Sequence, residues 1–171
     1  MRLSVVVALV AVVAAASSPA TRADPPGTLS PHAEEAAALA GESPAIRAPL
    51  SSAQLDDLRR ARAERAAGPS RVVYGYYPYW VADLERIRWS ALTHLAWFSI
   101  EMDAAGVVTA RHGWPDRATV DAAHAAGVKV DLTFTLFSGS GILALTRDPA
   151  RRATAIAAMI AELEAGGADG I

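Results

Sequence analysis

Apolar runs rich in aromatic and β-branched residues recur through the second half of the chain. They predict strands over residues 72–80, 93–100 and 128–135. A short amphipathic segment at 83–89 separates the first two runs, and the small residues at 138–141 predict a loop after the third. Buried strands and connecting segments therefore alternate in this region.

Two of the connections carry the signals of helix ends. Asp116 stands where an N-cap is expected, and Gly127 stands where the same helix should end. Asp148 begins a longer helix that reaches about Glu164, and residues 168–171 then look like the start of a fourth strand. This alternation predicts an α/β fold with parallel strands and right-handed crossovers. A doubly wound sheet and a (β/α) barrel both fit the pattern.

The amino-terminal part of the chain differs in its composition and in its pattern of apolar residues. Met1 and Arg2 precede an apolar run over residues 3–16, which is shorter than the ~20 residues of a membrane-spanning helix. Small residues follow, so we predict a Sec-type signal peptide over residues 1–23, with an uncleaved membrane anchor as the alternative. Residues 24–50 are rich in proline, alanine, glycine and serine, and this composition predicts a disordered linker. The protein is thus expected to be secreted, either to the periplasm or outside the cell.

A helix is expected between this linker and the first strand, over residues 51–69. Ser51 and Gln54 have the spacing of a capping box, and Gly68 with Pro69 ends the helix. Few of its residues are large and apolar, so it is either solvated or loosely docked on the domain. Acids interleave with its arginines, which is typical of a solvated face rather than a binding patch.

Composition and charge exclude several classes of function. The 171 residues include no cysteine, so the chain has no disulfide, thiolate metal site or cysteine nucleophile. A formal net charge of -2 gives no basic footprint for nucleic acid or for an anionic membrane surface. The glycines at 138–141 lack the lysine of a phosphate loop, and His112 and His124 lack metal-ligand spacing. We expect no cofactor, no metal, no nucleic acid and, after signal cleavage, no membrane partner.

Three short motifs occur in order along residues 71–171. Residues 74–77 read Tyr-Gly-Tyr-Tyr, the next strand opens with Thr93 and His94, and residues 168–171 read Ala-Asp-Gly-Ile. In this order and separation they resemble the first half of a glycoside hydrolase family 18 protein, whose fourth strand carries Asp-Gly-x-Asp-x-Asp-x-Glu. The resemblance implies that the chain from residue 70 onward is the N-terminal portion of a (β/α)8 TIM barrel.

One departure from the family pattern concerns the third strand, which in the family usually ends in Ser-x-Gly-Gly. Here the small residues are displaced to 138–141, which indicates a divergent, chitinase-like subgroup. With three strands and the start of a fourth, the inward residues Tyr76, Phe98 and Phe134 would lack an opposite wall. We therefore expect that this chain does not form a closed, stable domain by itself.

The resemblance also implies an activity for the full-length protein. It would be a secreted glycosidase that cleaves the β-1,4 bonds of N-acetylglucosamine polymers, either chitin or a peptidoglycan-type glycan. The family uses substrate-assisted retaining catalysis, in which the substrate's N-acetyl group replaces a protein nucleophile. The acid glutamate would follow Ile171, so this chain is expected to be inactive alone. The alternatives are a non-catalytic, lectin-like carbohydrate-binding barrel and an unrelated barrel enzyme.

Candidate site residues lie at the carboxyl ends of the strands, where such barrels place their active sites. We expect Tyr76, Trp97 and Phe98 to bind the polysaccharide or oligosaccharide, because aromatic rings stack on the C–H faces of sugars. Trp97 and Phe98 point in opposite directions, so only one of them faces the barrel axis. The alternative is that these rings simply fill the barrel interior.

Asp169 is the candidate from the family's catalytic motif. It corresponds to the motif's first aspartate, which implies a supporting role in a chain of carboxylates rather than chemistry of its own. The alternative for Asp169 is a turn residue between a helix and a strand.

Overall fold

The computed structural model describes residues 34, 37–39, 41, 43–64, 69 and 71–171. The predicted signal peptide, residues 1–23, and most of the predicted linker lie outside this range. No helix among the described residues is long and apolar enough to cross a membrane.

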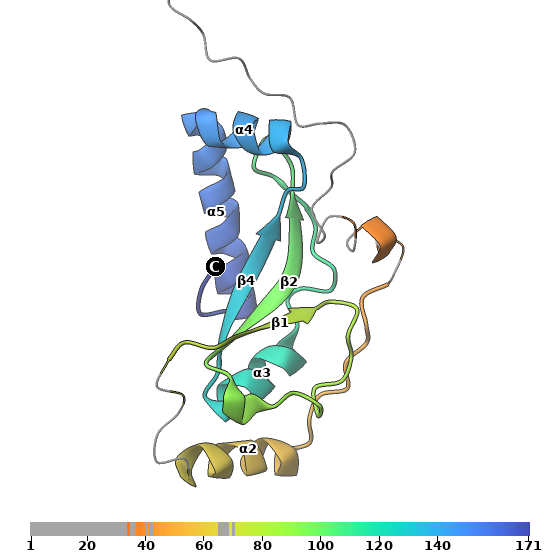
Figure 1. Ribbon diagram of the computed structural model, residues 1–171, viewed down its shortest axis with the longest axis vertical. Coiled ribbons are helices and arrows are strands. Elements are labelled where there is room, and N and C mark those ends of the chain that lie inside the picture. Colours follow the sequence, from red (N-terminus) through yellow and green to blue (C-terminus); the bar gives the residue numbers. More distant parts are fainter. Residues whose placement is uncertain (1–33, 35–36, 40, 42, 65–68, 70) are drawn as a thin grey trace, which may run out of the picture.

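A parallel sheet forms around one central strand. Its strands are β1 (Tyr74–Pro78), β2 (His94–Met102), β3 (Val108–Ala110) and β4 (Lys129–Thr135). The central strand β2 pairs in parallel with β1 along one edge and with β4 along the other, and the three lie side by side (Figure 1). The short strand β3 turns back antiparallel to the end of β2. The predicted parallel pairing is confirmed.

A further strand begins beside β4, as expected from residues 168–171. Gly170 pairs in parallel with Asp131, and its carbonyl accepts a hydrogen bond of 2.9 Å from the Leu132 amide. Asp169 donates its own amide to the Val130 carbonyl at 2.7 Å. The order β1, β2, β4 and then this segment follows the order of the sequence.

Helices form the connections. They are α2 (Ser52–Glu64), α3 (Arg117–Ala126), α4 (Gly139–Arg147) and α5 (Pro149–Gly166), with a one-turn 3-10 helix, η1, at Trp89–Ala91. The predicted caps are confirmed, because Asp116 accepts the Thr119 amide and Gly127 adopts the left-handed conformation that ends α3. The prediction of a loop at residues 138–141 is wrong. Ser138 accepts the Gly141 amide at 3.1 Å and caps α4, which begins at Gly139.

One face of the sheet packs against helices and forms the core. Leu95, Trp97 and Leu132 of the sheet lie against Val120 of α3, and all four side chains are buried. Alternate residues of β4 share a face, so Phe134 packs against this same core with Leu132. The expectation that Phe134 points inward, toward a barrel axis, is therefore wrong.

The strand β2 contains an irregularity near its end. Phe98 pairs with Thr133 of β4, whereas the next pairing joins Ile100 to Phe134, so Ser99 is an extra residue on β2. This bulge lets Ile100, which is fully buried, lie in the core. The Phe98–Ser99 peptide bond is cis.

The chain ahead of the first strand is docked on this core. Ser51 and Gln54 form the predicted capping box, in which the Ser51 amide donates to Gln54 at 2.8 Å and the Gln54 amide donates back at 3.3 Å. Leu55 and Leu58 of α2 pack against the core, so the helix is docked rather than solvated. The Ala45 amide donates to the Tyr79 carbonyl at 3.0 Å. The prediction of a disordered linker is therefore wrong for its last residues, 43–50, because they make tertiary contacts that composition does not reveal.

The end of α5 packs against a buried tryptophan, so we expect that Gly166 does not tolerate a larger side chain. A Cβ at Gly166 would overlap the ring of Trp114, which is buried and donates its Nε1–H to the Glu162 carbonyl at 3.0 Å. We predict that Gly166→Ala in the full-length protein lowers the free energy of unfolding by about 1–3 kcal/mol, because overpacking outweighs the gain in helix propensity. Urea unfolding measures the change. Glu164→Ala, at an exposed site on the same turn, should change it by less than about 0.5 kcal/mol, and equal effects of the two would contradict the overlap.

Candidate functional site

An aromatic surface lies where β1 and β2 end. The ring centroids of Tyr76 and Phe98 are 6.4 Å apart, and those of Phe98 and Trp80 are 6.1 Å apart, both edge to face. We call these three residues the aromatic platform. Tyr76 is 70% exposed, and the other two side chains are half-buried. The carboxyl ends of parallel strands are where ligand sites of α/β folds occur.

The structure brings together two of the three predicted sugar-contacting residues and separates the third. Tyr76 and Phe98 lie on the platform, whereas Trp97 is fully buried on the opposite side of β2. Trp97 packs there against Trp114 and Tyr77, with centroids 5.6 and 6.5 Å away. Its place in the core corrects the expectation that Trp97 contacts a ligand, and it follows from the alternation of side chains along a strand.

Asp169 lies at the other end of the sheet. Its Oδ2 accepts a hydrogen bond of 2.8 Å from the Val130 amide, at the start of β4, and is 2.8 Å from Nε2 of His124. Partial burial alone would raise the pKa of Asp169, but these two hydrogen bonds and the charge of Lys129 together lower it. These contacts fasten α3 and the new strand to the amino end of β4. The supporting catalytic role of Asp169 stays a prediction.

A polar cluster that the sequence analysis did not single out lies between these two ends. Asp131 of β4 is only 7% exposed, although its side chain is a carboxyl group. The rings of Tyr74 and His94 are stacked with their centroids 4.7 Å apart, and a hydrogen bond to Asp131 raises the pKa of the Tyr74 phenol. A signal was present in the sequence, since a carboxylate interrupts the apolar residues of this strand and a buried carboxylate needs partners.

Polar side chains also border the platform. Ser99 follows Phe98 in the chain, and its hydroxyl is 3.2 Å from that of Thr135 on the adjoining strand, where both side chains are buried. Glu101, near the end of β2, is paired with His112 at 2.9 Å, and the His112 ring stacks on Tyr79 with centroids 4.0 Å apart. The buried hydroxyl pair joins the two strands, whereas the Glu101 carboxylate, 47% exposed, can accept hydrogen bonds from a ligand beside the rings.

The chemistry of the described residues is that of binding. The platform supplies apolar ring faces, and its border supplies an imidazole–carboxylate pair. Within the part of the chain that the structure describes, no group of three or more histidines and acids could hold a metal ion. The arrangement is suited to a ligand with alternating C–H faces and hydroxyl groups.

Comparison with known proteins gives structural relatives only. No family model and no curated protein sequence matches the chain. A chitinase from Bacteroides thetaiotaomicron is similar in structure, with a TM-score of 0.51 and 24% identity, over 58% of this chain and 34% of that chain. A chitinase from Rhizomucor miehei gives a TM-score of 0.51 and 18% identity, over 58% of this chain and 32% of that chain. The likeness is therefore one of fold, and it spans about a third of each chitinase.

The lowered pKa of Asp169 predicts a pH dependence of stability. A carboxyl with a lowered pKa stabilises the fold fully above its unfolded pKa of about 3.9, and this contribution is lost as the pH falls through the folded value. Asp169→Asn should therefore lower the free energy of unfolding at pH 6, and the difference from wild type should shrink below about pH 4. Urea unfolding between about pH 3 and 7 measures both.

A second variant tests the origin of that effect. His124→Ala removes one of the two hydrogen bonds to Asp169 and should give a smaller loss with the same pH dependence. A difference between wild type and Asp169→Asn that stayed constant down to pH 3 would show that ionisation of Asp169 does not stabilise the fold.

Proposed function

We propose that this chain is the amino-terminal part of a secreted, chitinase-type glycoside hydrolase with a (β/α)8 barrel. The observation that carries the proposal is the aromatic platform of Tyr76, Trp80 and Phe98 at the carboxyl ends of parallel strands. The structural likeness to two chitinases supports the fold, and the motifs at 74–77, 93–94 and 168–171 support the family 18 subgroup.

The proposed substrate is a β-1,4-linked polymer of N-acetylglucosamine, either chitin or a peptidoglycan-type glycan. Rings of such sugars have apolar faces that stack on Tyr76 and Phe98, while the half-exposed Glu101 carboxylate can accept hydrogen bonds from their hydroxyl groups. The formal net charge of -2 is compatible with a substrate that is not strongly charged.

The proposed mechanism is substrate-assisted and retaining. A glutamic acid after Ile171 would protonate the leaving oxygen, and the N-acetyl group of the substrate would attack the anomeric carbon. The residues described here then hold and orient the polymer, and Asp169 supports the motif from the amino end of the sheet.

A lectin-like barrel is the second candidate. The carboxylate bordering the platform, Glu101, is already paired with His112, so binding alone is consistent with the described residues. Turnover of N-acetylglucosamine oligomers by the full-length protein would favour the hydrolase, whereas saturable binding without turnover would favour the lectin.

Tyr76 provides the sharpest test of the sugar-binding proposal. In the full-length protein, Tyr76→Ala should weaken the affinity for N-acetylglucosamine oligomers at least about fivefold, because stacking on an aromatic ring contributes at least ~1 kcal/mol. Isothermal titration calorimetry measures the affinity, and hydrolysis kinetics give the matching change in kcat/KM. Tyr76→Phe keeps the ring and should retain most of the affinity.

Tyr74→Ala is the matched control, since Tyr74 is on the same strand and face but two residues nearer the amino end. It should leave the affinity unchanged within about twofold. If Tyr76→Ala and Tyr74→Ala had equal effects on affinity in folded proteins, the platform would not be the sugar site.

Export is the remaining part of the proposal. The apolar run over residues 3–16 and the small residues after it support cleavage by signal peptidase. Amino-terminal sequencing of the protein from its native host should show a start near Thr21 or Asp24. An intact Met1 on a membrane-bound product would contradict secretion.

A further inference from the structure

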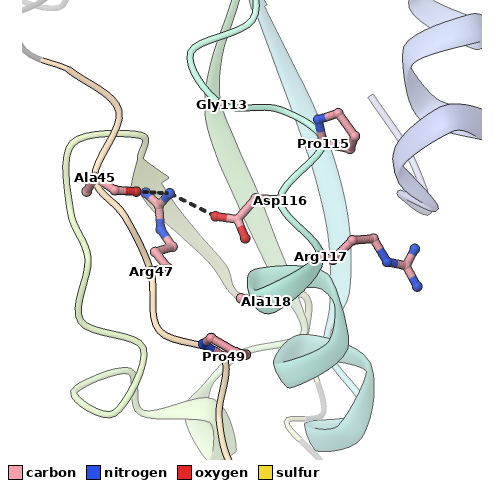
Figure 2. A pocket seen from close by; sticks show the side chains of 8 residues that line it. All are labelled: Ala45, Arg47, Pro49, Gly113, Pro115, Asp116, Arg117 and Ala118. Atoms are coloured by element: carbon pink, nitrogen blue, oxygen red, sulfur yellow. Dashed lines mark hydrogen bonds and ion pairs between the residues drawn. The ribbon is translucent and has the colours of Figure 1, made fainter.

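A buried cation lies on the helix side of the sheet, away from the aromatic platform. The Arg47 side chain is 3% exposed, and its Nη1 is 2.8 Å from Oδ2 of Asp116, the N-cap residue of α3. Figure 2 shows Arg47 between Ala45 and Asp116, beside a pocket of about 390 Å³. The other hydrogen-bond acceptors of the guanidinium are Tyr77 Oη at 3.3 Å and the carbonyls of Tyr79 at 2.8 Å, Pro78 at 3.1 Å and Ala45 at 3.3 Å.

Aromatic rings complete the surroundings of this guanidinium. Its central carbon lies 4.9 Å from the ring centroid of Tyr77 and 4.6 Å from that of Trp97. A planar cation with five N–H donors matches this set of rings, carbonyls and carboxylate, whereas a lysine ammonium presents only three donors from one point. The surroundings are therefore specific for a guanidinium group.

We infer that Tyr77, Trp97, Asp116 and the carbonyls of Pro78 and Tyr79 form a guanidinium-binding cage whose ligand is the chain's own Arg47. We call residues 43–50 the strap. Through Arg47, the strap fastens the carboxyl end of β1 to the start of α3. It is an intramolecular ligand of the domain, and the cage recognises the arginine in it.

The connection between β1 and β2 gives a reason for this arrangement. Residues 79–93 contain only the one-turn helix η1, whereas the connection from β2 to β4 carries α3, and the chain after β4 carries α4 and α5. Parallel strands usually owe the cover of their outer face to such crossover helices. Here Leu84 and Trp89 of the connection enter the core, and Leu50 of the strap and Leu55 of α2 pack against it as well.

The path of the strap is also shaped to the domain. A Cβ at Gly113 would lie 3.1 Å from Cβ of Pro44, and Gly113 has a φ of +86° that disfavours other residues. Together with the Ala45 amide, which donates to Tyr79, this contact places the strap in one position along its length. The cage and the close approach at Gly113 therefore act on the same segment.

The experiment removes the ligand and then returns it in solution. In the full-length protein, Arg47→Ala should increase the rate of proteolytic cleavage within residues 43–50 on the order of 100-fold, because Asp116 loses its buried partner. Arg47→Lys should restore only part of the protection. Arg59→Ala is the matched control, because Arg59 lies on α2 with 60% of its side chain exposed and, among the residues that the structure describes, pairs with the nearby Asp56.

Guanidinium chloride between zero and about 50 mM, where its denaturing effect is small, is the probe for the empty cage. It should raise the Tm of Arg47→Ala with saturation, and ammonium chloride at the same concentrations should not. Asp116→Asn in the Arg47→Ala background keeps an oxygen that can cap α3 but removes the charge, so it should abolish the rise.

Three results would overturn the inference. The first is protection of residues 43–50 in Arg47→Ala equal to that in Arg59→Ala. The second is a change in Tm with guanidinium concentration that does not saturate, or that is the same in Arg47→Ala and in the double variant that also carries Asp116→Asn. The third is an Arg47→Ala protein that stays unfolded at every guanidinium concentration, because an intact cage should accept the free cation.

Discussion

Pairing of β2 with a parallel strand on each side is the constraint on which the rest of the structure depends. Once both edges of β2 are hydrogen-bonded, its side chains have only two directions, and each neighbouring residue goes to the opposite face. Trp97 then enters the helix-covered core, and Phe98 joins Tyr76 on the platform. The hydrophobic core and the proposed binding surface are thus two sides of one strand.

The two ends of the sheet have different tasks. At the amino end, Asp169 and His124 join a helix to a strand through charge-assisted hydrogen bonds. At the carboxyl end, the exposed ring of Tyr76 lies beside Phe98, and the Glu101–His112 pair is near the end of β2. Parallel α/β folds generally place ligand sites at the carboxyl ends of their strands, and the position of the platform agrees with this rule.

The sequence was informative where local chemistry decides the structure. The caps at Asp116 and Gly127 follow from short-range hydrogen bonds and backbone preferences, and both were predicted. The helix α4 was missed because Ser138 and the glycines after it have low helix propensity, although Ser138 is a good N-cap. The role of Arg47 was not predictable, since its partner Asp116 is 69 residues away and only the folded chain brings them together.

The bulge at Ser99 sets a limit on how the length of this strand can vary. Because Ser99 lies outside the pairing, the alternation of side chains continues from Phe98 to Ile100, so Ile100 faces the core and Glu101 takes the opposite direction. An in-frame gain of one more codon, without a second bulge to absorb it, would shift the alternation by one residue and so bury a carboxylate and expose a fully buried isoleucine in a single event. Substitutions in this part of the gene are far easier for the fold to absorb than such a gain in its length.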